Sequence, residues 1–259
     1  MNWASILVAV DGHQGGLDAA SLASVLAKPD SELAIGHVPL RDAGLAADAI
    51  RKTRAMLGRP DTRVLVARRH SVAIGLHELV DESGADLLVV GAHHHRHLDL
   101  RSRDHTRATL RDLPCAVAVA PHRYATRPDH AVGTVGVGFV DDPSGRIVLD
   151  VARGVAWQLG AEVRATTVVA PSNWTAADSG AGWRAAAAQL RMAEIPGVHG
   201  AAVEGVPLRA LALISTRVDL LVVGARHHHV VRRLLVGEVA ERLSHTSRCP
   251  LLVVPHPPT

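Results

Sequence analysis

The sequence of 259 residues predicts an α/β protein made of two repeated, doubly wound domains, each with a five-stranded parallel sheet. The first observation behind this prediction is a duplication, because the segment DLLVVGA occurs at residues 86–92 and again at 219–225. The second is that the apolar runs are almost continuous in Val, Leu, Ile and Ala. Such runs are typical of parallel strands that are buried on both faces of a sheet.

The duplication extends beyond this segment. A histidine-rich stretch follows each copy, HHHRH at 93–97 and RHHH at 226–229. Each half then has a cysteine beside a proline and a closing apolar run, PCAVAVAP at 114–121 and CPLLVVPH at 249–256. Because the pieces recur in the same order, the chain contains two copies of one domain.

The start of each copy and the join between the copies are also visible in the sequence. Each copy opens with an apolar run that ends near aspartate, ILVAVDG at 6–12 and VGVGFVDD at 135–142. The segment 122–131 is polar, contains a proline and lacks apolar periodicity. We therefore place the domains at 1–124 and 132–259.

Strands are expected at the short apolar runs, and helices at the longer stretches between them. The predicted strands are 5–10, 33–38, 63–67, 86–91, 116–120, 134–140, 161–169, 200–204, 219–224 and 250–254. The predicted helices are 14–28, 43–58, 71–84, 103–113, 143–159, 181–194, 207–217 and 236–246. Sheets of this kind bind ligands at the carboxyl ends of their strands.

The composition excludes several classes of protein. No apolar run is long enough to span a bilayer, and no signal peptide is visible, so we predict a cytoplasmic protein without a membrane partner. Two cysteines are too few for a disulfide scaffold. The net charge is +3, acids are mixed among the bases, and aromatic residues make up 2%, which argues against nucleic acid as a partner.

The sequence resembles the universal stress proteins in their tandem two-domain form. The resemblance rests on ILVAVDGHQGG at the start, both DLLVVGA segments, VEGVP at 203–207 and CPLLVV after the second copy. It implies the strand order 3-2-1-4-5 in each half and a pairing of the halves, often about the fifth strand. We expect two separate five-stranded sheets related by a pseudo-twofold axis.

The resemblance also implies a candidate nucleotide site, since many members bind ATP through G-x2-G-x9-G-S/T after the fourth strand. In the first half Gly91 matches, His94 replaces the second glycine, and Arg103 or Asp104 stands in place of the third. The aspartate of the first strand, which lies near the adenosine in the family, is Asp11. The candidate contacts in the first half are Asp11, Gly12, Val38, Gly91, His93, His94 and Arg103.

The second half departs from the pattern differently. Gly224 and Gly237 match, whereas His227 and Glu238 replace the second glycine and the hydroxyl residue. The place of Asp11 falls on Val140. The candidate contacts in the second half are Gly224, Arg226, His227, Gly237 and Glu238.

These changes weaken a phosphate cradle, because glycine permits a close approach of phosphate to backbone N–H groups and a carboxylate repels phosphate. We therefore predict a stress-response regulator that acts through contacts with an unknown protein partner, with no bound cofactor. The alternative is a sensor of ATP or AMP with at least one working site. Self-association stays open.

Other signals are weaker. The histidine loops could hold a metal ion or respond to pH, but solvated loop histidines are the simpler interpretation, and we assign no metal site. Cys115 and Cys249 are interpreted as small apolar residues in tight turns. The sequence has no G-x-S-x-G elbow, P-loop or H-E-x-x-H motif, so we assign no enzymatic activity and no catalytic residue.

Overall fold

The computed structural model describes residues 3–39, 43–68, 71–92, 113–169, 180–225 and 238–255. The first half contains β1 (Ser5–Val10), α1 (Gln14–Leu26), β2 (Glu32–His37), α2 (Ala43–Leu57), β3 (Arg63–Val66), α3 (Val72–Ser83), β4 (Leu87–Gly91), β5 (Ala116–Ala120) and the 3₁₀ turn η1 (Tyr124–Thr126). The second half contains β6 (Thr134–Gly138), α5 (Pro143–Leu159), β7 (Glu162–Val169), α6 (Gly180–Ala193), β8 (His199–Glu204), α7 (Pro207–Ile214), β9 (Leu220–Gly224), α8 (Glu238–Thr246) and β10 (Leu251–Val254). These bounds agree with the predicted elements to within three residues. The helix predicted at 103–113 lies outside the described residues, except for Leu113.

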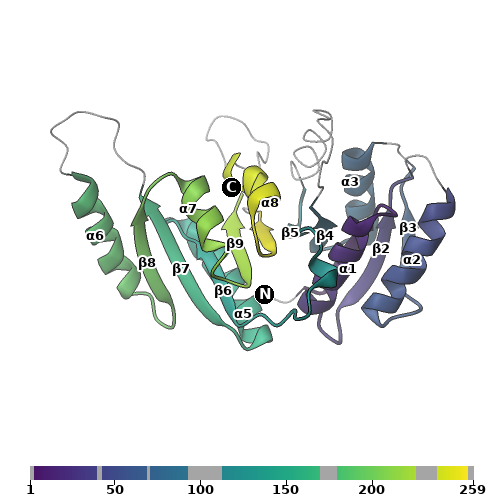
Figure 1. The fold of residues 1–259 in the computed structure, drawn as a ribbon, viewed down its shortest axis with the longest axis horizontal. Helices are drawn as coiled ribbons and strands as arrows, with labels where there is room; N and C mark the ends of the chain where they lie inside the picture. The colour runs from purple at the N-terminus through teal and green to yellow at the C-terminus, as the bar shows by residue number, and fades with distance from the viewer. Residues whose placement is uncertain are drawn as a thin grey trace.

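The sheet differs from the prediction in one respect. Its ten strands form a single sheet in the order β3-β2-β1-β4-β5-β10-β9-β6-β7-β8, so the expectation of two separate sheets was wrong (Figure 1). Within each half the strands are parallel and follow the order 3-2-1-4-5, as expected. The halves join where β5 pairs with β10 in the antiparallel sense.

This central pairing is symmetric. Ala120 lies beside Gly91, and Val254 lies beside Gly224, so Ala120 and Val254 are equivalent positions of the repeat. By the same alignment Ala118 and Leu252 are equivalent, and they face each other across the join. The pseudo-twofold axis therefore passes through this pair. Both fifth strands cover their hydrogen-bonding edge with the other copy, which removes two edges that would otherwise be open.

Both faces of the sheet are buried, as the continuous apolar runs predict. Ile6 and Val8 of β1 belong to a core formed with α1, α2, α5 and Met192 of α6. Leu7, between them, belongs to a core formed with α3, α7 and α8 on the opposite face. Each core extends across both halves, so the halves share two continuous apolar layers.

Local sequence explains where several elements begin and end. Asp142 accepts a hydrogen bond from the Gly145 N–H at 2.7 Å and caps α5, which has a proline in its first turn. The helices α3 and α5 end at Gly84 and Gly160, both in the left-handed conformation that glycine adopts without strain.

The aspartate that opens each copy of the duplicated segment has a structural role. The carboxylate of Asp86 accepts hydrogen bonds from the N–H groups of Ala4 and Ser5, at 2.8 and 3.1 Å. Asp219 does the same for Gly133 and Thr134, at 3.0 and 2.9 Å. Each aspartate therefore fixes the start of the first strand of its own half.

The join between the halves is firmly held by α1. Asp18 is fully buried, and its carboxylate accepts hydrogen bonds from the N–H groups of Arg123 and Ala125, at 2.9 and 2.8 Å. The Tyr124 ring, between these two residues, is buried and makes an edge contact with the His130 ring. The polar segment predicted as the join between the halves is therefore an ordered connection.

Both cysteines are free and buried, and burial raises the pKa of Cys115 to about 12 and that of Cys249 to about 11. Because the thiolate is the reactive form, about one thiol in a thousand or fewer is ionised at pH 8. We expect the native thiols to react with Ellman's reagent about a hundredfold more slowly than those of the protein unfolded in urea. Fast reaction of either thiol in the folded protein would contradict this burial.

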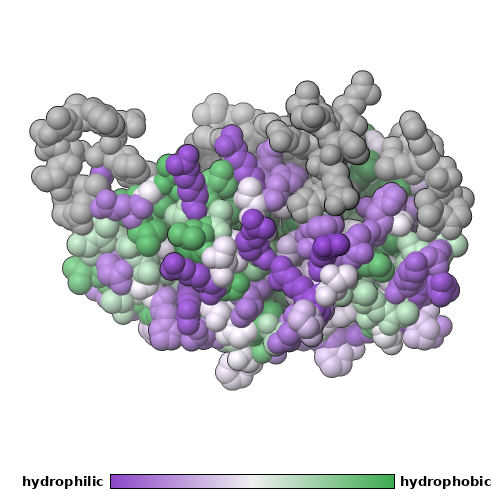
Figure 2. Space-filling model, in the orientation of Figure 1, coloured by the Kyte–Doolittle hydropathy of each residue, from purple (hydrophilic) through white to green (hydrophobic). Residues whose placement is uncertain are grey.

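The face shown in Figure 2 carries both hydrophilic and apolar side chains. Hydrophilic side chains cover the middle of the face shown in Figure 2, and apolar side chains are more frequent over α6, α7 and β8. Leu190, Val206 and Leu213 are exposed in this region. No helix in the described part of the chain is both long and apolar enough to cross a membrane.

Candidate functional site

The candidate site in the first half starts at the turn that follows β1. The Asp11 carboxylate accepts a hydrogen bond from the His13 N–H at 2.9 Å, and Gly12 has a φ of 83°. This positive φ suits glycine, because a side chain there would be strained. The turn leads directly into α1 at the carboxyl end of β1, where a sheet of this order places ligands.

Gly91, at the end of β4, lies against the first turn of α1. A Cβ on Gly91 would be only 2.2 Å from the carbonyl oxygen of Gly15. A Cβ on Gly15 would lie 3.6 Å from Asp11 Oδ2 and 3.9 Å from Gly91 Cα. The structure therefore brings Asp11 and Gly91 together, and close packing alone already requires a glycine at position 91.

We expect Gly91→Ala to lower the free energy of unfolding by about 2–3 kcal/mol, because the new methyl group meets backbone that has no free space. Gly15→Ala is the matched control on the other side of the same contact, where a methyl group makes ordinary van der Waals contacts. It should be neutral or slightly stabilising, because alanine favours the helix. Urea unfolding measures both, and equal effects of the two changes would contradict the packing.

His37 is a residue of this edge that the sequence analysis missed. It is buried at the end of β2, beside Val10, and its Nδ1 lies 2.9 Å from the Val10 carbonyl oxygen. Because a carbonyl only accepts, Nδ1 carries the proton and donates. A histidine at the end of an apolar strand was the available signal.

Val38 does not present its side chain to the candidate site. The side chain is buried against α3, since a Cβ on Gly75 would lie 2.8 Å from Val38 Cγ2. A ligand beside Asp11 could therefore use only the backbone of this residue.

The equivalent edge of the second half has a different charge arrangement. The strand registers align Asp11 with Val140, which is exposed and carries no charge. The next residue, Asp141, faces two guanidinium groups, with Oδ2 at 3.3 Å from Arg191 Nε and Oδ1 at 3.9 Å from Arg146 Nη2. Its carboxylate is therefore engaged by α5 and α6.

The remaining candidate residues are only partly placed. Gly224 ends β9, and Glu238 is the first residue of α8. The other members of the predicted set lie outside the described residues. They are His93, His94, Arg103, Arg226, His227 and Gly237. Within the described ranges, no group of three or more His, Cys, Asp and Glu side chains could hold a metal ion.

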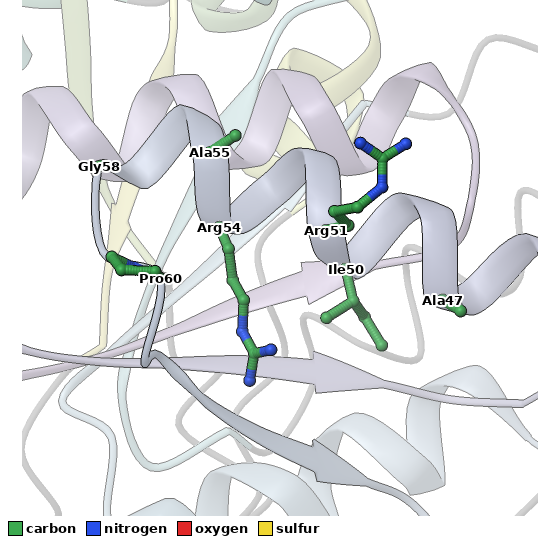
Figure 3. A pocket seen from close by; sticks show the side chains of 7 residues that line it. All are labelled: Ala47, Ile50, Arg51, Arg54, Ala55, Gly58 and Pro60. Atoms are coloured by element: carbon green, nitrogen blue, oxygen red, sulfur yellow. The ribbon is translucent and has the colours of Figure 1, made fainter.

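A shallow cavity of about 560 Å³ lies along α2, away from this edge (Figure 3). Arg54 points toward the strands there and donates to the Thr62 carbonyl at 2.8 and 3.2 Å, while Arg51 points elsewhere and pairs with Asp48. Both guanidinium groups are therefore already engaged within the chain, and the cavity is not a candidate for the function.

The comparisons with known proteins agree with this architecture. Residues 132–255 match the model of the universal stress protein family. The second half is thus similar to this family by sequence, and the first half shares the segment DLLVVGA with the second half. No curated relative matches the sequence.

Solved structures show the same fold over the whole chain. A universal stress protein from Archaeoglobus fulgidus DSM 4304 superposes with a TM-score of 0.65 at 16% identity, over 98% of this chain and 99% of that one. A putative universal stress protein from Pseudomonas aeruginosa UCBPP-PA14 gives 0.65 at 18% identity, over 98% and 93%. The cytoplasmic domain of a prokaryotic cation chloride cotransporter gives 0.56 at 13% identity, over 97% and 95%. The fold alone therefore does not determine the function.

Proposed function

We propose that this chain is a tandem universal stress protein, a regulator of the stress response that acts through protein contacts. The observation that carries the proposal is the family match at residues 132–255 together with the letter-for-letter repeat of DLLVVGA in the first half. In this proposal the chain is not an enzyme, and binding of adenine nucleotide is lost in the second half and weakened in the first.

Electrostatics support the loss in the second half. Asp141, next to the position of Asp11, is engaged by two arginines, and Val140 offers an adenosine no carboxylate. A phosphate about 5 Å from the Glu238 carboxylate would be repelled by roughly 3 kcal/mol at an effective dielectric near 20. This repulsion corresponds to a loss of about two powers of ten in affinity.

The alternative is a sensor of ATP or AMP whose working site is in the first half. Asp11, Gly12 and Gly91 favour it, because they keep the family pattern and lie together at the carboxyl ends of β1 and β4. His94 and either Arg103 or Asp104 argue against it, since they stand where glycines would allow phosphate to approach the backbone.

The deciding experiment is to denature the purified protein and measure released adenine nucleotide by absorbance and mass spectrometry. We expect less than one nucleotide per ten chains, and only millimolar affinity for added ATP or AMP by calorimetry. If a nucleotide does bind, Asp11→Ala should weaken it about tenfold, while Asp141→Ala should not. Stoichiometric nucleotide in the native protein would favour the sensor.

A further inference from the structure

The second helix lies differently in the two halves. In the first half α2 packs along α1, whereas in the second half α6 packs on the edge strand β8. Figure 1 shows α2 and α6 at opposite ends of the molecule. Among the described residues, α5 and α6 make little direct contact.

A glycine on β8 permits this shift. The strand registers align Gly200 of β8 with Val64 of β3. A Cβ on Gly200 would lie 2.7 Å from Met192 Cβ and 2.9 Å from the Met192 carbonyl oxygen, so α6 approaches β8 only because no side chain is there. Gln189 strengthens the contact, since its side-chain amide bonds to the Gly200 carbonyl and the Ala202 N–H, at 3.0 and 2.7 Å.

The shift leaves a cavity of about 520 Å³ between α5 and α6, in the size range of small-molecule sites. Its apolar lining includes the buried residues Phe139, Leu149, Ala188 and Met192. The Thr167 hydroxyl also lines it and bonds to the Met192 sulfur at 3.4 Å, which is a weak acceptor that a better one would replace.

The charged groups around this cavity are unevenly paired. Arg153 bonds to the Pro196 carbonyl at 2.8 Å and lies 3.5 Å from Asp150. Asp141 is shared between Arg191 and Arg146, so one carboxylate serves two guanidinium groups. Three arginines and three acids line the cavity, and the third acid is Glu194. Since two guanidinium groups share one carboxylate, a single anionic group fits beside Arg191 and Arg146. Because the charges balance overall, a polyphosphate does not fit.

We propose that this cavity binds an apolar small molecule that carries one anionic group. The apolar body lies on Phe139 and Met192. The anion pairs with the guanidinium group of Arg191, which shares the Asp141 carboxylate with Arg146. The cavity lining includes Asp141, at the carboxyl edge of β6, but neither Val140 nor Gly224 of the candidate nucleotide site. The proposal holds whether or not the chain binds ATP.

The test uses 1-anilinonaphthalene-8-sulfonate as the anionic probe and N-phenyl-1-naphthylamine as its uncharged counterpart. The protein is labelled with carbon-13 at its methionine methyl groups, and binding is followed by NMR and by fluorescence. Met192 reports on the cavity, and Met56 on α2 is an internal control. We expect one sulfonate per chain, with a shift of the Met192 signal and none of the Met56 signal.

Three variants locate the interaction. Arg191→Gln should weaken the sulfonate about tenfold and leave the uncharged probe unchanged. Ala188→Leu should narrow the cavity and weaken binding of both probes. Arg209→Gln, at an exposed position of α7 on the opposite face, should change neither. ATP should not displace the sulfonate.

The proposal is overturned if the Met192 signal does not move, or if Ala188→Leu leaves binding intact. It is also overturned if Arg191→Gln weakens both probes equally, since the anion would then have no role. Displacement by ATP would assign the cavity to the nucleotide instead.

Discussion

Replacing Asp18 by alanine is expected to lower the free energy of unfolding by about 3 kcal/mol. The carboxylate is fully buried and accepts hydrogen bonds from the Arg123 and Ala125 N–H groups and from Gln14 Nε2. Hydrogen bonds to a charged acceptor contribute about 1.5–3 kcal/mol each, and the substitution would remove three of them from partly buried donors. Urea denaturation of the full chain measures the effect.

Two controls make this result interpretable. Asp18→Asn keeps the shape but replaces one acceptor by a donor, so it should cost nearly as much as alanine. Asp150→Ala, on α5, removes an exposed carboxylate whose side chain is 73% accessible, and it should change stability by less than about 0.5 kcal/mol. A loss below about 1 kcal/mol for Asp18→Ala would show that the join is held by its apolar contacts instead.

The second large effect concerns phosphate in the second half. In the full chain carrying Asp11→Ala, we expect the double change His227→Gly with Glu238→Ser to raise ATP affinity about a hundredfold. The serine supplies a hydroxyl in place of a repelling carboxylate, and the glycine allows the backbone to approach phosphate. Calorimetry with millimolar ATP measures the gain over the Asp11→Ala parent.

Glu238→Gln in the same background separates charge from shape, because it removes the carboxylate without adding the short hydroxyl. It should recover part of the gain if repulsion is the main obstacle. No gain from the double change would mean that the missing carboxylate at Val140 is the larger obstacle, which Val140→Asp would then test. Micromolar ATP binding by the Asp11→Ala parent itself would refute the argument.

The sequence predicted the strands of this protein well because each is a short apolar run between polar turns. The predicted strand 116–120 coincides with β5, and the predicted helix 143–159 coincides with α5. The pairing of β5 with β10 was expected only from the family resemblance, because apolar runs carry no record of which strand covers a sheet edge. For that reason two sheets were expected where the chain forms one.

The candidate site was predictable only where a residue acts through its immediate neighbours. The turn at Asp11 and Gly12 depends on residues next to it in the sequence. The contact between Gly91 and Gly15 joins segments far apart, so Gly91 was interpreted as a phosphate contact when packing already requires it. The role of Asp18 was not visible in the sequence, because the two backbone N–H groups that it binds lie more than 100 residues away.

The symmetric pairing of the fifth strands has an evolutionary consequence. Covalent fusion turns an encounter between two subunits into a contact within one molecule, at an effective concentration that for short links reaches about the millimolar range. Assembly no longer depends on the protein's abundance in the cell, and the ratio of the two copies is fixed at one to one. Each copy is therefore free to change its sequence without losing its partner.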